Sequence, residues 1–444
     1  MPDPKIRAPR GTFDVLGEQA GERETLAERA RAILEGAGYE RIETPVLEAT
    51  ELFARGVGES TDIVSKEMFT LTDGAGRSLT LRPEGTAPVC RAYVEHGMHK
   101  RRQPVKLWYL SSFFRSERAQ AGRYRQFWQV GAEALGSEDP AVDAESIALL
   151  ARLLSDMGVA DVRLRVSSLG SAESRGEHRE RLQAHLRAHE QDLSAEVRAR
   201  IEHNPLRAFD SDHEGTRRVM ASAPRLLDHL DTADAEHFAQ VRALLDTAGV
   251  AYEVDATLVR GLDYYTRTVF EFTSDALGAQ SGVGGGGRYD GLVQRLGGPP
   301  TPGMGWAAGV ERMLLAGDAQ PAPAPVVQLF LALDDQGRDG RDHGGEDELK
   351  GPPAGGRDGS REALRLAAFE LLGEARAAGL TAQMELQGRS LKGQLGHADA
   401  LGARYVAILS SGGEAVLKDM QGGDQERLPA NAVVHAVLRG LHEL

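Results

Sequence analysis

The chain has 444 residues, of which 41% are hydrophobic and 27% charged, a balance typical of globular proteins that argues against a disordered chain. Its 52 basic and 66 acidic residues give a formal net charge of −14, which argues against non-specific coating of nucleic acid. The single cysteine, Cys90, excludes an intrachain disulfide and a zinc site built on several cysteines.

The N-terminal segment has no apolar stretch of signal-peptide length, and no later window approaches the length and apolar character of a membrane span. We therefore expect a cytoplasmic protein without membrane contact. Apolar residues at helical spacing predict an amphipathic helix over 22–38. A short strand over 41–44 ends at Pro45, which indicates a strand that stops there or lies at a sheet edge.

The next part of the chain has the pattern of an antiparallel sheet. Strands are expected at 68–72 and 78–81, on either side of a glycine-containing turn, and longer strands at 105–114 and 126–135. The stretch 118–125 between the last two is polar and basic. This strand–loop–strand order favours antiparallel pairing.

A helical insertion is expected at about 171–250, where Ala, Arg, Glu, His and Leu recur at helical spacing and β-branched runs are few. Strands return at 268–272 and near 281–287. A helix is expected to begin near Trp306 and to carry Arg312.

A stretch rich in proline and alanine, 317–325, predicts a boundary between a domain over 1–325 and a domain over 326–444. The apolar run 326–333 predicts a buried parallel strand, and the helices and strands that alternate after it indicate a small α/β domain with a mainly parallel sheet. Residues 334–360 contain eight glycines, many charges and no aromatic residue, so we expect a disordered insertion there.

Five short segments combine charged, aromatic and glycine residues in ways that suggest a ligand site. They lie at 82–86, 114–127, 258–266, 284–291 and 303–312. Taken singly, each has a structural alternative. These are a helix cap by Glu84, a solvated sheet face with scattered arginines, an Arg260–Asp263 ion pair, a flexible glycine turn, and a Glu–Arg pair of the kind common on helices.

The second of these segments has the chemistry of a nucleotide pocket. Arg115 ends one predicted strand and Phe127 lies in the next, so a guanidinium suited to phosphate can face an aromatic ring suited to a base. Gln129 and Glu133 share one strand face by the two-residue repeat and predict a lined pocket. The four glycines 284–287 indicate a close approach to the backbone, and they match neither a P-loop nor a dinucleotide motif.

In this order and spacing, the segments resemble histidyl-tRNA synthetase, a class II aminoacyl-tRNA synthetase. Residues 38–45 are similar to class II motif 1, 107–135 to motif 2 and 303–312 to motif 3. The more specific likeness lies in the histidine-binding segments of this family, which 82–86, 258–266 and 284–292 resemble. Residues 388–405 are similar to its anticodon-binding domain.

The resemblance implies an α+β catalytic domain, in which helices flank an antiparallel sheet and a helical insertion is present, followed by a C-terminal α/β anticodon-binding domain. It implies ATP-dependent ligation of L-histidine to tRNA(His) through a histidyl-adenylate, with release of AMP and pyrophosphate. It also implies a homodimer, Mg²⁺ that accompanies ATP, and no structural metal bound by the protein.

The resemblance assigns roles to particular residues. The catalytic residues, which also bind ATP together with Phe127, are Arg115, Arg260 and Arg312. The residues implied to hold the histidine amino group are Glu84, Thr86 and Gln129. Those implied to bind the imidazole are Glu133 and Tyr265, in a pocket shaped by Tyr264 and Tyr289.

Other family assignments compete with this one. A regulatory subunit of ATP phosphoribosyltransferase shares the catalytic fold, but it typically lacks the C-terminal domain and the RGLDYY segment, and this chain has both. Class II synthetases for glycine, proline or threonine lack the Tyr264–Tyr265 pair after Arg260. A tRNA-sensing protein without catalysis is disfavoured by the presence of Arg115, Arg260 and Arg312.

Overall fold

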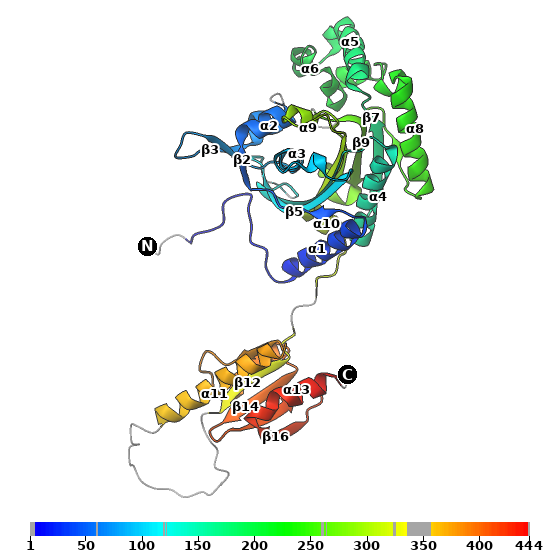
Figure 1. Cartoon of the computed structure of the whole chain (residues 1–444). Coiled ribbons are helices and arrows are strands. Elements are labelled where there is room, and N and C mark those ends of the chain that lie inside the picture. Colours follow the sequence, from blue (N-terminus) through cyan, green and yellow to red (C-terminus); the bar gives the residue numbers. More distant parts are fainter. Residues whose placement is uncertain are drawn as a thin grey trace, which may run out of the picture. The chain divides into compact units, whose positions relative to one another are not determined.

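The chain forms two compact units, 1–322 and 323–444 (Figure 1). The computed structural model describes residues 5–58, 61–118, 120, 122–258, 262, 264–322, 326–334 and 357–442. Arg260 and most of the segment 334–360 therefore lie outside the described residues. None of the described helices is both long enough and apolar enough to cross a bilayer.

An eight-stranded sheet forms the centre of the first unit, in the order β1-β5-β6-β11-β10-β9-β7-β8. The strands are β1 Glu40–Arg41, β5 Val105–Phe114, β6 Gln126–Leu135, β7 Val162–Ser168, β8 Glu253–Val254, β9 Thr266–Ser274, β10 Gly282–Arg288 and β11 Gly303–Gly309. Pairing is antiparallel except at the two edges, where β1 joins β5 and β8 joins β7 in parallel. The predicted antiparallel sheet is confirmed.

Helices cover both faces of this sheet. Even-numbered residues of β6, such as Val130 and Ala132, enter a core shared with α1 Glu18–Gly36 and α4 Pro140–Asp156. Odd-numbered residues of the neighbouring β5, such as Tyr109, enter a second core with α3 Thr86–Glu95 and α9 Leu292–Arg295. Because both cores are apolar, a polar side chain on the odd-numbered face of β6 must find a partner there.

The first unit also contains a small three-stranded sheet, in the order β2-β4-β3. Its strands are β2 Leu47–Ala49, β3 Phe69–Thr72 and β4 Ser78–Leu81, and α2 Thr50–Val57 follows β2 directly. The strands β3 and β4 match the predicted runs. The strand β2 and the helix α2 were not predicted, because three strand residues give too short a pattern to recognise.

The helical insertion contains α5 Ala172–Ala188, α6 Ala195–Arg200 and α7 Glu214–Met220, and α8 Thr232–Thr247 completes the helical region. Apolar residues between Leu182 and Ala223 form a core of their own. In contrast, Phe238 and Val241 of α8 enter the main core beside α4. Figure 1 shows α5 and α6 together at one end, with α8 lying along α4. The part with a separate core is thus narrower than 171–250.

The prediction that a helix begins near Trp306 is wrong. Residues up to Gly309 form the strand β11, and the helix α10 Val310–Ala316 begins only after it. Gly305 of this strand leaves room for a side chain of the neighbouring β6, since a Cβ at this position would lie 1.7 Å from Glu133 Oε2. Arg312 therefore lies in the first turn of a short helix that leaves the sheet.

The second unit contains a five-stranded sheet in the order β13-β12-β14-β15-β16. Its elements are β12 Leu329–Asp334, α11 Arg357–Ala377, β13 Ala382–Met384, α12 Leu391–Ala400, β14 Tyr405–Ser410, β15 Glu414–Asp419, β16 Gln425–Pro429 and α13 Val433–His442. Only β13, β12 and β14 are parallel, so the expectation of a mainly parallel sheet is only half correct. The strand β16 was missed because only one of its residues, Leu428, is buried, so the strand has no alternating apolar pattern.

A buried ion pair joins the end of β10 to α4. Arg288 and Asp143 are both fully buried, and Arg288 Nη2 lies 2.6 Å from Asp143 Oδ1. His237 of α8 lies 2.9 Å from the other carboxylate oxygen. Arg288 also donates to the backbone oxygens of Ser137 and Asp139, so its charge is compensated on several sides.

We predict that Asp143→Ala lowers the free energy of unfolding of the first unit by about 3 kcal/mol, because the buried Arg288 guanidinium loses its closer carboxylate and keeps only Asp290, at 3.2 Å. Chemical denaturation followed by tryptophan fluorescence measures this unit alone, because all three tryptophans of the chain lie in it.

The matched control is Asp275→Ala, which breaks the exposed Arg163–Asp275 pair. An exposed ion pair is expected to contribute less than about 1 kcal/mol. If Asp143→Ala loses no more free energy of unfolding than Asp275→Ala, the buried pair does not stabilise the first unit as predicted.

Candidate active site

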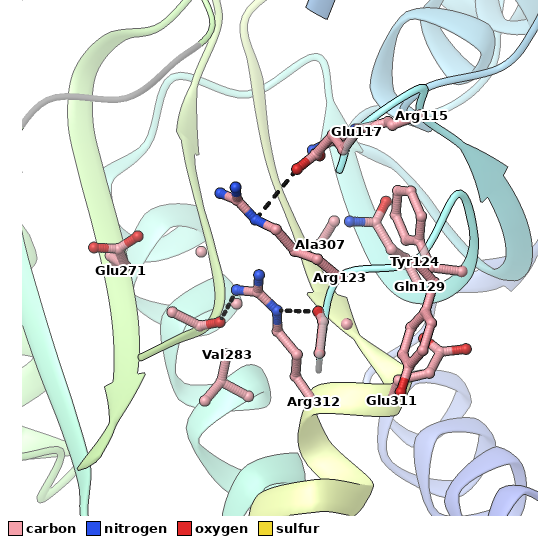
Figure 2. A pocket seen from close by; sticks show the side chains of 16 residues that line it. Arg115, Glu117, Arg123, Tyr124, Gln129, Glu271, Val283, Ala307, Glu311 and Arg312 are labelled. Atoms are coloured by element: carbon pink, nitrogen blue, oxygen red, sulfur yellow. Dashed lines mark hydrogen bonds and ion pairs between the residues drawn. The ribbon is translucent and has the colours of Figure 1, made fainter. Parts of the chain in front are cut away.

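A pocket in the first unit collects side chains from β6, β9, β10, β11, α10 and the loop between β5 and β6 (Figure 2). Four residues expected at the ligand site line it, namely Arg115, Phe127, Gln129 and Arg312. These residues come from positions almost 200 apart in the chain, and the sheet brings them together. The structure does not describe the expected third arginine, Arg260.

Arg115 is held in place just after the end of β5. Its Nε donates to the backbone oxygen of Pro83 at 3.0 Å, and its guanidinium carbon lies 5.2 Å from the centre of the Phe127 ring. Glu117 is more distant, with 3.9 Å between its carboxylate and Arg115 Nη1. A backbone acceptor and an aromatic face thus orient the guanidinium plane.

Arg312 is held by two backbone oxygens on opposite sides of the pocket. Its Nε donates to Gly122 at 3.0 Å, and its Nη1 donates to Gly282 of β10. Burial lowers the pKa of Arg312, and the positive charges of Arg123 and Arg115 lower this pKa further. The pocket therefore concentrates positive charge, which favours a polyanionic ligand.

Four charged residues of this pocket were assigned no role from the sequence, namely Glu117, Arg123, Glu271 and Glu311. Arg123 pairs with Glu117 at 3.2 Å, and Figure 2 shows the guanidinium groups of Arg123 and Arg312 extending toward the same space. Glu271 enters from β9. The available signals were the basic character of 118–125 and a charged residue within the apolar strand 268–272, and neither was specific enough to assign a role.

A second, buried polar cluster is centred on Glu133, which is fully buried. Glu133 Oε1 accepts from Thr86 Oγ1 at 2.8 Å and from Tyr109 at 3.4 Å, while Oε2 accepts from the Tyr289 hydroxyl at 2.5 Å. Burial raises the pKa of Glu133 to about 8. The two oxygens can take part in about four hydrogen bonds, with the proton of the neutral form counting as one of these, so one position remains for a ligand.

Three tyrosine rings pack beside this carboxyl group. Tyr264 and Tyr265 are nearly buried, with ring centres 4.8 Å apart, and Tyr264 and Tyr289 meet edge to face at 5.8 Å. The structure thus brings together the residues expected to bind and surround an imidazole. Their hydroxyl groups can donate or accept, which suits a ring that has one donor and one acceptor when neutral.

Glu84 has the structural role that was the alternative from the sequence. Its carboxylate accepts from the backbone nitrogens of Thr86 at 2.8 Å and Ala87 at 3.0 Å, so it caps the N-terminus of α3. Burial raises the pKa of Glu84. The cap holds this carboxylate beside Thr86, which joins it to the Glu133 cluster.

Tyr109 is a further member of the cluster that the sequence did not identify. Its ring fills the space above two glycines, since a Cβ at Gly85 or at Gly131 would lie 2.4 or 2.3 Å from the Tyr109 ring. Tyr109 and Gly131 are cross-strand partners in β5 and β6. The sequence signal was Gly131, which lies between Gln129 and Glu133 on one strand face and leaves room there for a bulky neighbour.

Backbone atoms of the neighbouring strands closely approach two of the glycines of β10. A Cβ at Gly286 would lie 2.0 Å from the oxygen of Gly305, and a Cβ at Gly287 would lie 2.6 Å from the oxygen of Thr268. The neighbouring strands themselves therefore approach these two positions. Gly284 and Gly285 line the arginine pocket.

The strand β6 connects the two clusters. Phe127, Gln129 and Glu133 lie on one face of it, so Gln129 and Glu133 are roughly 13 Å apart along the strand. A ligand with one anionic end and one hydrogen-bonding ring fits this arrangement. Among the described residues, no group of three or more His, Cys, Asp or Glu side chains is placed to hold a metal ion.

Comparison with known proteins finds relatives that match nearly the whole chain. A family model described as histidyl-tRNA synthetase matches residues 11–313. The histidine–tRNA ligase of Halorhodospira halophila is 47% identical over 450 residues, which cover 99% of this chain and 99% of the relative. The crystal structure of apo S. aureus histidyl-tRNA synthetase is 32% identical, covers 98% of this chain and 100% of its own, and has a TM-score of 0.76.

A structure from Bacillus halodurans C, described as an ATP phosphoribosyltransferase regulatory subunit/histidyl-tRNA synthetase, has a TM-score of 0.61 and covers 91% of this chain and 98% of its own. At 21% identity, it shows a shared fold alone.

We predict that Glu133 makes the stability of the first unit depend on pH. Because its folded pKa of about 8 lies above its usual 4.5, its stabilising contribution is complete below pH 4.5 and is lost as the pH rises through 8. The free energy of unfolding should fall by at most about 1.4 kcal/mol per pH unit over this window.

The matched variant is Glu133→Gln, which keeps a neutral side chain of similar shape at every pH. Denaturation of both proteins between pH 5 and 8 should show a steeper decline for the unmodified chain. Parallel pH profiles would mean that Glu133 does not retain its proton in the folded state.

Proposed function

The chain belongs to the histidyl-tRNA synthetase family, and from this premise we propose how its residues divide the reaction between them. The chain ligates L-histidine to tRNA(His) in two steps driven by ATP. First, a carboxylate oxygen of histidine attacks the α-phosphorus, the bond to the bridging oxygen breaks, and pyrophosphate leaves. A terminal ribose hydroxyl of the tRNA then attacks the carbonyl of the histidyl-adenylate, and AMP leaves.

The observation that carries the proposed site is that one face of β6 joins a pocket of arginines to a buried carboxyl group. We assign the arginine pocket to ATP and the Glu133 cluster to histidine. The histidine carboxylate then meets the α-phosphate between the two. Holding both reactants on one rigid strand supplies the orientation that the first step needs.

In the ATP pocket, we assign Arg115 to the α-phosphate, where negative charge grows during the attack. Arg260 is assigned there as a second cation, by resemblance to the family. Arg312 is assigned to the γ-phosphate end and to the face of the adenine opposite Phe127. The guanidinium of Arg115 lies over the Phe127 ring, so the other face of that ring is the one assigned to the base.

In the histidine pocket, we assign Glu133 and Tyr265 to the imidazole, within walls made by Tyr264 and Tyr289. The hydrogen-bonding position left open on Glu133 supports this assignment. An amino acid without the imidazole nitrogens leaves these buried polar groups unpaired, which is an effective basis for rejection.

The amino group of histidine is assigned to Glu84, Thr86 and Gln129. The first two are supported by their place beside Glu133, and Gln129 by its place on the pocket wall between the two clusters.

Mg²⁺ is proposed to enter with ATP. Phosphate and carboxylate oxygens are the ligands that this ion prefers, and the carboxylates of Glu117 and Glu271 line the arginine pocket. Both can contribute to holding the ion while the arginines bind the phosphates. The chemistry that the ion supplies is neutralisation of charge on the triphosphate.

A homodimer in the cytoplasm is proposed as the working form. The region similar to motif 1 adjoins the three-stranded sheet, on which Val46, Leu47 and Leu71 are each 40 to 43% exposed. Apolar side chains grouped on one surface are typical of a subunit interface, and a twofold dimer is the commonest arrangement.

The second unit is proposed to bind the anticodon. Leu366 and Phe369 of α11 and Leu386 after β13 are each about two-thirds exposed, and Arg365 lines the same surface. An exposed aromatic ring beside arginine is suited to an unpaired base and its phosphate. The domain assignment, with a catalytic domain over 1–325 and this domain over 326–444, remains part of the proposal.

The regulatory-subunit alternative has less support. The relative that is 47% identical over nearly the whole chain is a histidine–tRNA ligase. The structure described with both names is 21% identical and shows only the fold.

We predict that Arg115→Ala lowers histidine-dependent ATP–pyrophosphate exchange at least about a hundredfold, the scale observed when one donor to a transition state is removed. Arg260→Ala should act similarly. The matched control is Arg118→Ala in the same loop, whose exposed side chain does not line the pocket and should change the rate little. Exchange at the unmodified rate in the Arg115 variant would refute its assignment.

We predict that Phe369→Ala weakens tRNA charging and leaves amino-acid activation intact. Loss of one base stack should raise the KM for tRNA(His) roughly tenfold or more, while ATP–pyrophosphate exchange stays unchanged. Glu374→Ala, exposed on the same helix but away from this surface, is the control. An unchanged KM for tRNA would remove Phe369 from the anticodon site, and equal loss in both assays would indicate a folding defect.

A further inference from the structure

The helical insertion is attached directly to the segment that carries Tyr264 and Tyr265. Arg175, in the first turn of α5, donates from Nη1 to the backbone oxygen of Tyr265 at 2.5 Å. Two backbone bonds lie beside it, from Leu169 to the oxygen of Arg267 at 2.6 Å and from Arg267 to the oxygen of Gly170 at 2.8 Å. The start of α5 and the start of β9 are therefore joined on both sides of Thr266.

Arg267 has a backbone conformation that needs this support. Its φ is +45°, in the left-handed region that residues with side chains rarely adopt. Its Nε lies 3.0 Å from Asp234 Oδ1, and Asp234 is 1% exposed. The other oxygen of Asp234 accepts from the backbone nitrogen of Ser171 at 2.5 Å. One carboxylate at the start of α8 thus holds both the strained residue and the start of α5.

Movement at the Tyr265 backbone would reach the carboxyl group of the histidine pocket through packed rings. A Cβ at Gly287 would lie 2.9 Å from the Tyr265 ring, so this ring lies tightly against β10. Tyr265 contacts Tyr264, Tyr264 contacts Tyr289, and Tyr289 donates to Glu133 at 2.5 Å. Because packed rings transmit displacement and do not absorb it, the position of Tyr265 affects the whole cluster.

We propose that Arg175 is a positioning residue for histidine binding, through which the seating of the helical insertion sets the geometry of the histidine pocket. The inference rests on the proposed assignment of Tyr265 and Glu133 to the imidazole. It follows that histidine affinity and the position of α5 are coupled. A ligand that displaces α5 changes the affinity for histidine, and bound histidine favours the seated position of α5.

The folding of the insertion does not depend on Arg175. The apolar core of the insertion begins at Leu182, two turns further along α5, and is built without Arg175. Arg179, one turn after Arg175, donates instead to the backbone oxygens of Glu202 and His203 inside the insertion. The same helix therefore offers one arginine that contacts the histidine pocket and one that does not.

The test measures the KM for histidine and the KM for ATP in pyrophosphate exchange, together with the melting temperature. Arg175→Ala should raise the KM for histidine about tenfold, the effect of losing one hydrogen bond from a charged donor, and leave the KM for ATP and the melting temperature unchanged. Arg175→Lys should restore most of the affinity, because an ammonium group can also donate to a carbonyl. Arg179→Ala should change neither KM.

The proposal is overturned if Arg175→Ala leaves the KM for histidine unchanged, or raises both KM values together with a lower melting temperature. Glu133→Gln in the same assay separates this result from the proposed function. If that variant raises the KM for histidine and Arg175→Ala does not, the positioning role fails and the histidine pocket stands. If Glu133→Gln leaves this KM unchanged, the assignment of the pocket fails, and the inference that rests on it fails too.

Discussion

The two-residue repeat of β6 is the constraint on which the rest of the site depends. Because successive side chains of a strand point to opposite faces, Phe127, Gln129 and Glu133 must share one surface. Antiparallel neighbours on both sides fix their register, with Gln129 opposite Ser111 of β5 and Gly309 of β11. A shift of one residue would move all three side chains into the opposite core. The distance between nucleotide and amino acid is therefore set by backbone geometry.

Space for the buried carboxyl group comes from residues that have no side chain. Gly305 lies across from Glu133 in β11, and Gly131 leaves room for the ring of Tyr109. Burial of the carboxyl group carries a desolvation cost, which three hydroxyl donors offset and which appears as a raised pKa. Such a group rejects a ligand that cannot complete its hydrogen bonds, so the feature that costs stability also provides selectivity.

The insertion and the catalytic sheet share a polar boundary. The buried Asp234 pairs with the partly exposed Arg267 at the point where α5, α8 and β9 begin, and Arg175 reaches from there to the tyrosine segment. In contrast, the core of the insertion is separate from the sheet. An element with its own core and a few polar attachments can move as a body, and the attachments decide what that movement affects.

The sequence by itself determined the strands β5 and β6 to the residue, and its spaced motifs indicated several residues of each cluster, because long alternating patterns and dense polar segments are local signals. It placed the start of a helix near Trp306, where the strand β11 continues to Gly309, since small residues carry no hydrophobic period. Only the tertiary structure decided that Tyr109 fills the space over two glycines and that Arg175 meets Tyr265. These contacts join residues distant in the chain, and which of them meet depends on how the sheet and helices pack.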